Sequence, residues 1–209
     1  VYADVMKYFV IVCVTIFLLV TLYIDVFKYF IGKDFRVGLQ VVPILLMANL
    51  FLGVYVNLSI WYKLTNRNLT GAWITIGGAV ITIVVNWTLI PYLGFVACAI
   101  SVTLCYGYMM AASYILGQKY YPVPYAVKKL TAYVVICLIM YGLHQLFRHF
   151  SPSIWWTHAF ALLEMAAFVA LIVKVEKKEL TDAEMVMQIE KQAELEERKN
   201  RHKKIDFAS

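Results

Sequence analysis

The fold is decided by a long stretch that contains no Lys, Arg, Asp or Glu and reads NLTGAWITIGGAVITIVVNWTLIPYLGFVACAISVTLCYGYMMAASYILGQ (residues 68–118). A transmembrane helix needs about 20 apolar residues to cross roughly 30 Å of hydrocarbon, so this stretch is long enough for two crossings. Its middle, IPYLG (residues 90–94), supplies a proline and a glycine, which commonly end helices. The stretch therefore predicts two transmembrane helices, at Gly71–Ile90 and Phe95–Gly117.

Four other apolar runs are long enough to cross a membrane as helices. Because lipid cannot hydrogen-bond to the backbone, an isolated crossing segment must satisfy its own N–H and C=O groups, as a helix does. The sequence therefore predicts an all-α polytopic membrane protein with about six transmembrane helices. The four runs are Tyr8–Phe27, Val37–Tyr62, Leu130–Phe147 and Ile154–Val173.

Composition supports this class. The 209 residues are 62% hydrophobic and 15% charged, with a mean hydropathy of +0.72, whereas soluble domains carry about 25% charged residues. The net charge of +6 does not indicate nucleic-acid binding, because the basic residues lie mainly at the ends of apolar runs and in the tail. That distribution is typical of membrane topology, and we expect no nucleic-acid partner.

The C-terminal part differs from the rest in charge. Thr181-Asp182-Ala183-Glu184 matches a capping box, the pattern that begins a helix, and predicts a separate charged helix over about Asp182–Lys203. We expect three regions: residues 1–129 and 130–173, which carry the transmembrane helices, and the tail 174–209.

Six crossings place both ends of the chain on one side. Most cations, from Lys7 and Lys63 to Lys129, then share that side, which the positive-inside rule makes cytosolic. The segment Asp25–Arg36 carries further cations on the opposite side. Its aromatic residues fit either a short amphipathic helix in the interface or a loop with aromatic anchors.

Polar residues inside the apolar runs are the candidate functional residues. Glu164 lies near the middle of the sixth predicted span, where an ionised carboxylate is costly and often marks an ion or proton pathway. A protonated Glu164 bonded to a neighbouring helix is the structural alternative. The sequence shows no intramembrane cation beside it, since we expect His144 and the three other histidines at helix ends or in the tail.

Asn49, Asn57 and Asn86 are further candidates for a transport path, although asparagines also hold membrane helices together. Pro43 and Gly53 are expected to interrupt the second span, and broken helices often line transport pathways. No arrangement of nucleophile and base, phosphate-binding loop or metal-ligand spacing is present in the sequence. We therefore expect neither catalysis nor a cofactor or metal site.

One run carries a resemblance to a known family. VVPILLMANLFLG (residues 41–53) and NLSIWYKLT (residues 57–65) resemble the polysaccharide flippases of Bacteroides-type bacteria. These belong to the multidrug/oligosaccharidyl-lipid/polysaccharide exporter superfamily. The pieces GAVITIVVN (78–86), IP (90–91) and GQKYYPVPY (117–125) continue the likeness, which covers most of residues 1–130.

The resemblance implies a fold, an activity and partners. By analogy the chain is the C-terminal part of a two-lobe transporter that moves undecaprenyl-linked oligosaccharide across the bacterial inner membrane by alternating access. The implied partners are this lipid-linked oligosaccharide, membrane lipids and other polysaccharide-assembly proteins. An ion such as Na⁺ or H⁺ is the expected energy source. Lys63 and Arg67 are candidates for contacts with lipid phosphates, although topological anchoring explains them equally well.

Three alternative functions stay open. A multidrug cation antiporter of the same superfamily would use Glu164 for its coupling ion. A membrane polysaccharide polymerase or ligase would carry a large outer loop with Arg and His. A non-transporting scaffold would act through the charged tail.

Overall fold

A computed structural model of the chain describes residues 2–150 and 154–206. Every regular element in these residues is helical, and six segments are long and apolar enough to cross a membrane. The predicted all-α polytopic membrane fold is confirmed. The elements are α1 (Tyr2–Leu22), α2 (Ile24–Phe27), the 3₁₀ helix η1 (Lys33–Val41), α3 (Val42–Leu58), α4 (Ile60–Leu64), α5 (Asn68–Leu93), α6 (Phe95–Tyr120), α7 (Val127–Phe150) and α8 (Ile154–Asp206).

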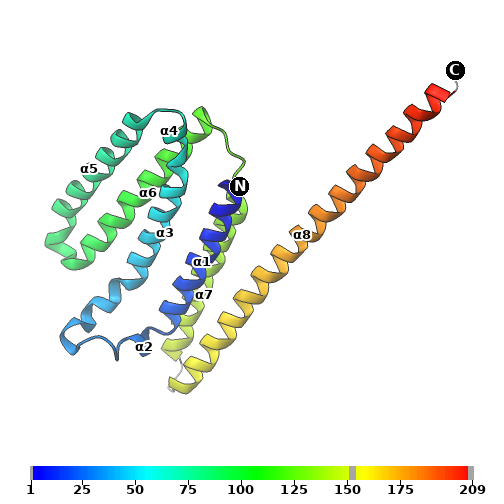
Figure 1. Cartoon of the computed structure of the whole chain (residues 1–209). Helices are drawn as coiled ribbons and strands as arrows, with labels where there is room; N and C mark the ends of the chain where they lie inside the picture. The colour runs from blue at the N-terminus through cyan, green and yellow to red at the C-terminus, as the bar shows by residue number, and fades with distance from the viewer. Residues whose placement is uncertain (1, 151–153, 207–209) are drawn as a thin grey trace. The chain divides into compact units, whose positions relative to one another are not determined.

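The chain forms two compact units, Val1–Met165 and Ala166–Ser209. The first is a bundle in which α3 packs against both α1 and α6, while α5 packs against α6 and α1 against α7 (Figure 1). Successive long helices run in opposite directions. One end of the bundle therefore carries the contact between Arg67 and Tyr120, and the other carries the contact between Asp25 and Arg148.

The predicted division of the uncharged stretch is confirmed, and a single residue makes it. Gly94, at φ 54° and ψ −132°, ends α5 and begins α6. Residues with a Cβ avoid this region of backbone space, so glycine is required there. Pro91 lies inside the last turn of α5 without ending it. The two helices consequently lie side by side as an antiparallel pair.

The predicted interruption of the second span by Pro43 and Gly53 is wrong. Pro43 lies in the first turn of α3, where its missing N–H costs no helical hydrogen bond. Gly53 lies inside α3 and packs directly against the ring of Phe9 on α1, with no room for a Cβ. The segment Phe35–Leu64 forms one candidate span, which changes from the 3₁₀ helix η1 to α3 at Val42 and is irregular again at Ser59, between α3 and α4.

The segment between α1 and α3 has features of both predictions made for it, a short helix in the membrane interface and a loop with aromatic anchors. The short helix α2 is followed by turns and by η1. Tyr29, Phe30 and Phe35 are all more than 70% exposed, next to the cations Lys28 and Arg36. Aromatic rings and cations together are typical of residues that anchor a protein at the membrane interface.

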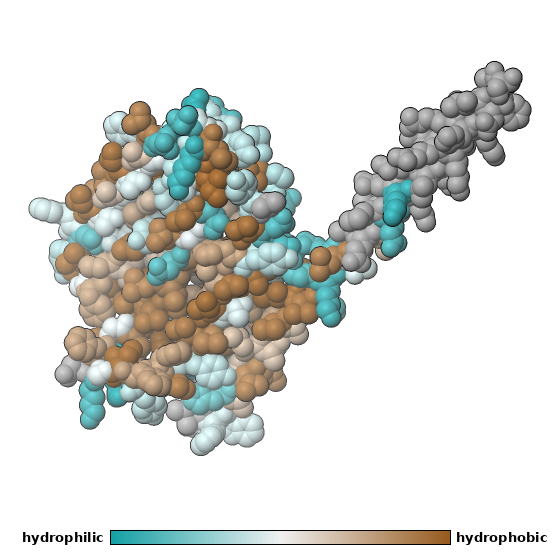
Figure 2. Space-filling view, viewed as in Figure 1, coloured by the Kyte–Doolittle hydropathy of each residue, from teal (hydrophilic) through white to brown (hydrophobic). Residues whose placement is uncertain are grey.

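One face of the bundle is largely apolar across its middle. Figure 2 shows hydrophobic residues across the middle of the bundle and hydrophilic residues toward its ends. Trp73 and Trp87 on α5 are 70% and 84% exposed. Large apolar side chains at this exposure are favourable in contact with lipid or with another apolar protein surface. The chain is thus a multi-pass membrane protein.

The second unit consists of the later turns of α8. The predicted separate start of a tail helix near Thr181 is wrong, because α8 continues without a break from Ile154 to Asp206. Thr181 does not cap a new helix; its hydroxyl donates to the carbonyl oxygen of Lys177, 3.0 Å away. No proline or glycine occurs between residues 154 and 206, so nothing in the local sequence ends the helix.

Candidate functional site

A buried acid–base pair lies inside the first unit. The Nδ1 atom of His144 on α7 is 3.0 Å from Oε2 of Glu164 on α8. Their side chains are only 3% and 6% exposed. Glu164 is therefore buried, and its partner is an imidazole on the neighbouring helix, where the sequence had shown no intramembrane cation beside it.

Aromatic packing fixes this pair between the two helices. The ring of Phe160 stacks on His144 at 6.3 Å between centroids and on Phe147 at 4.2 Å. His144 and Phe147 lie one turn apart on α7, and Phe160 and Glu164 lie one turn apart on α8. Spacings of three and four residues place side chains on one helix face, so the same face of each helix supplies a ring and a polar group.

The site also contains buried polar atoms that lack a partner. Among the residues that the structure describes, Oε1 of Glu164 and Nδ1 of His158 are buried and accept or donate no hydrogen bond. The His158 ring stacks on Tyr23, with 6.0 Å between centroids and an interplanar angle of 5°. A buried polar group without a partner is destabilising. The unpaired carboxylate oxygen of Glu164 can therefore accept a proton or a hydrogen bond.

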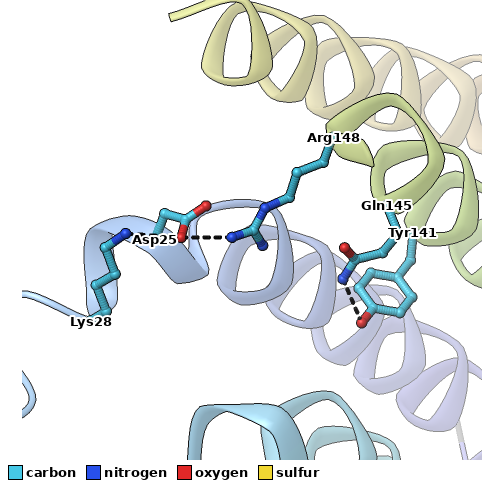
Figure 3. Close-up of polar contacts among 5 residues, drawn as sticks. All are labelled: Asp25, Lys28, Tyr141, Gln145 and Arg148. Atoms are coloured by element: carbon cyan, nitrogen blue, oxygen red, sulfur yellow. Dashed lines mark hydrogen bonds and ion pairs between the residues drawn. The ribbon is translucent and has the colours of Figure 1, made fainter. Parts of the chain in front are cut away.

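A polar cluster lies at the end of the bundle next to this pair. Nη2 of Arg148 is 2.9 Å from Oδ1 of Asp25, and Nζ of Lys28 is 3.2 Å from the same oxygen, as Figure 3 shows. Nearby on α7, Gln145 donates a hydrogen bond to the Tyr141 hydroxyl at 2.9 Å. All five residues line a cavity of about 290 Å³.

His144 is the residue that sequence reasoning missed. It was expected at a helix end, yet it lies two turns before the end of α7, and it is buried with Tyr133 and Cys137. These buried positions are separated by four and seven residues, which is the spacing of one helix face. That periodicity was the available signal, because it places His144 on the packed side of α7.

The three candidate asparagines are not brought together. Asn49 and Asn57 on α3 donate to carbonyl oxygens of their own helix, at Leu45 (2.8 Å) and Gly53 (3.0 Å). Asn86 lies on α5, and its Oδ1 atom is buried without a partner among the described residues. Asn49 and Asn57 thus satisfy their side chains locally, and the described contacts do not assemble a polar path from these residues.

Arg67 and Lys63 lie at the opposite end of the bundle from Arg148, and both are exposed. The Arg67 guanidinium lies over the ring of Tyr120, 4.0 Å from its centroid. Tyr120 in turn stacks on Trp61 at 5.7 Å. The indole Nε1 of Trp61 donates to the carbonyl and hydroxyl oxygens of Ser113, at 3.1 and 3.2 Å. The Arg67 guanidinium therefore lies on a ring that is itself packed against Trp61.

An apolar cavity of about 460 Å³ opens between α1, α3, α6 and α7. Its lining is almost entirely hydrocarbon, with Leu50, Phe51 and Leu58 contributed by α3. Tyr125, in the connection before α7, lines it as well. Burial, and then the nearby Tyr121, raise the pKa of Tyr125, so its hydroxyl is an uncharged hydrogen-bonding group.

No cluster of three or more His, Cys, Asp or Glu side chains that could hold a metal ion occurs among the residues that the structure describes. The sequence matches no family model, no curated protein and no solved structure.

Proposed function

We propose that the chain is part of a flippase that moves an undecaprenyl-linked oligosaccharide across the bacterial inner membrane by alternating access, without breaking a covalent bond in its substrate. The observation that carries the proposal is the apolar cavity of about 460 Å³, which lies next to a cationic end of the bundle. A polyprenyl pyrophosphate has the matching chemistry, because its tail is hydrocarbon and its head is anionic.

The lining of the cavity supports this assignment. Leu50, Phe51 and Leu58 belong to the runs that resemble the polysaccharide flippases, and all three line the cavity. Burial of a hydrocarbon chain in a cavity of this kind is favourable by about 0.8 kcal/mol for each CH₂ group removed from water, and less for a chain that arrives from lipid.

Two cations follow the cavity-lining part of α3 in the sequence. Lys63 on α4 follows Leu58 by one to two helical turns, and Arg67 lies just before α5. The guanidinium of Arg67 lies over the Tyr120 ring, and its exposed N–H groups can reach a phosphate. Arginine binds phosphate through two parallel hydrogen bonds. A pyrophosphate at this end would keep the lipid tail within reach of the cavity.

A pair of neighbouring substitutions tests the role of the cavity. Val134 lines the cavity, whereas Val135 on the same helix is 46% exposed and does not line it. Val134→Trp fills the cavity and should reduce surface polysaccharide in cells that depend on the full-length protein. Val135→Trp makes the same change at the neighbouring residue, outside the cavity, and should leave surface polysaccharide at the wild-type level. The comparison is made with equal amounts of both variants in the membrane. Equal polysaccharide levels in the two variants would contradict the proposal.

A further inference from the structure

We propose that His144 and Glu164 form a proton-binding site that takes up one proton through the polar cavity at the α2 end of the bundle. The site would supply the coupling ion of the proposed flippase, so its role in transport rests on that proposal. Proton binding by the pair does not depend on the flippase proposal, because it can be measured in the absence of any substrate.

The geometry of the pair defines where the proton binds. In its deprotonated form the pair consists of a neutral imidazole and a carboxylate, and Nδ1–H of His144 then donates to Oε2 of Glu164 across the 3.0 Å contact. Two positions remain for an added proton, namely Nε2 of His144 and the unpartnered Oε1 of Glu164. A proton at either position makes the pair neutral. Burial favours that neutral form, since a net charge is costly in an apolar bundle.

Charged and titratable groups lie around the pair at the α2 end of the bundle. Arg148 on α7, Asp25 on α2 and His158 on α8 face it. Lys28, the residue that follows α2, binds the Asp25 carboxylate. Arg148 is the cation of the facing set, and a nearby cation favours the negatively charged, deprotonated form of the pair.

A proton is a better match than a sodium ion. Hard cations are bound by several oxygen ligands, whereas this site offers one unpartnered carboxylate oxygen, an imidazole and the rings that pack on them. Intramembrane proton relays are commonly built from histidine and carboxylate side chains that lie next to one another in space.

The route to the pair begins in the polar cavity of about 290 Å³. Tyr141, Gln145 and Arg148 on α7 line this cavity, and His144 lies one turn before Arg148 on nearly the same face. A helical turn is about 5.4 Å long. A proton in the cavity therefore has only about one turn to cross before it reaches the imidazole.

The first test is a titration of the full chain in lipid nanodiscs, with NMR of labelled histidine nitrogens and glutamate carboxyl carbons. Over about pH 5 to 8, where histidine ordinarily titrates, the His144 and Glu164 signals should shift together, because strongly interacting groups titrate as a unit. Glu164→Gln should abolish this joint shift. Glu179→Gln, which removes an exposed carboxylate of α8, should leave it unchanged. Signals that stay constant, or that shift independently of each other, would overturn the proposal.

A second test addresses the route. Leu39 on η1 lines the polar cavity, whereas Val37 on the same helix is 55% exposed and does not. After a pH jump, Leu39→Trp should slow proton uptake by the pair without changing the final amount bound, and Val37→Trp should match the wild type. Equal uptake rates in both variants would refute entry through this cavity. Intact proton binding in a protein that moves no lipid would refute the flippase assignment alone.

Discussion

Replacing Gly117 by alanine should destabilise the bundle, and the structure gives the size of the effect. A Cβ atom at residue 117 on α6 would lie 2.9 Å from Cδ1 and 3.1 Å from Nε1 of Trp61. The indole has little freedom to move, because it is 4% exposed, bonded to Ser113 and stacked on Tyr120. Forcing extra atoms into a packed site typically costs about 1–3 kcal/mol.

Gly142 on α7 is the matched control, because a Cβ there meets no atom within 4 Å. Both substitutions gain up to about 1 kcal/mol from the higher helix propensity of alanine. The difference between them therefore isolates the collision with Trp61, and Gly142→Ala should be the more stable variant by about 1–3 kcal/mol.

The assay is equilibrium unfolding of the full chain in mixed micelles with a rising fraction of denaturing detergent, followed by circular dichroism. Repeating both variants in a Trp61→Phe background should shrink the difference, since residues in direct contact are not additive. Equal stability of Gly117→Ala and Gly142→Ala would rule out a collision with Trp61. A stability difference that is unchanged when the indole is removed would also rule it out.

Three further predictions concern other parts of the bundle. Gly94→Ala should lower stability by about 1–3 kcal/mol, because φ of 54° with ψ of −132° is strained for any residue with a Cβ; an unchanged midpoint in the same unfolding assay would contradict this. Asp25→Asn should cost no more than about 1 kcal/mol for each of its two ion pairs, because Arg148 and Lys28 are 40% and 32% exposed and solvent screens both pairs; the loss should diminish at high salt, and a larger, salt-independent loss would argue against screened pairs. Single cysteines at Lys33 and Lys119 should react with an impermeant maleimide from opposite sides of sealed vesicles, and labelling from one side would disprove the alternation of the helices.

The sequence predicted the elements of this fold better than the contacts between them. The length of apolar runs and the presence of Gly94 are local properties, so the six spans and the α5–α6 division could be placed without a structure. The role of Gly53 could not be predicted because it depends on a residue far away in the sequence: Phe9, on another helix, packs against the backbone of α3 at this glycine. The capping pattern at Thr181 was also misleading, because a favourable start signal does not end a helix that is already continuous.

The same distinction applies to the candidate site. Glu164 was identified from sequence because a carboxylate in an apolar run is conspicuous wherever it folds. His144 was not identified from sequence, because its contact with Glu164 depends on how α7 packs on the first part of α8. For Asn49 and Asn57 on α3, the sequence suggested an involvement that the structure does not show. Their polarity suggested contacts between helices, but a carbonyl oxygen one turn earlier on the same helix was already within 3.0 Å, so their side chains bond locally.

The central claim, transport of a lipid-linked oligosaccharide, is tested most directly by measuring where this lipid accumulates when the full-length gene is deleted in its source organism. The proposed function predicts that lipid-linked units accumulate on the cytosolic leaflet while surface polysaccharide is lost, and that complementation restores both. Trapping on the outer leaflet would instead indicate a lost polymerase or ligase. Unchanged lipid and polysaccharide with greater sensitivity to organic cations would contradict the flippase assignment and favour a cation antiporter.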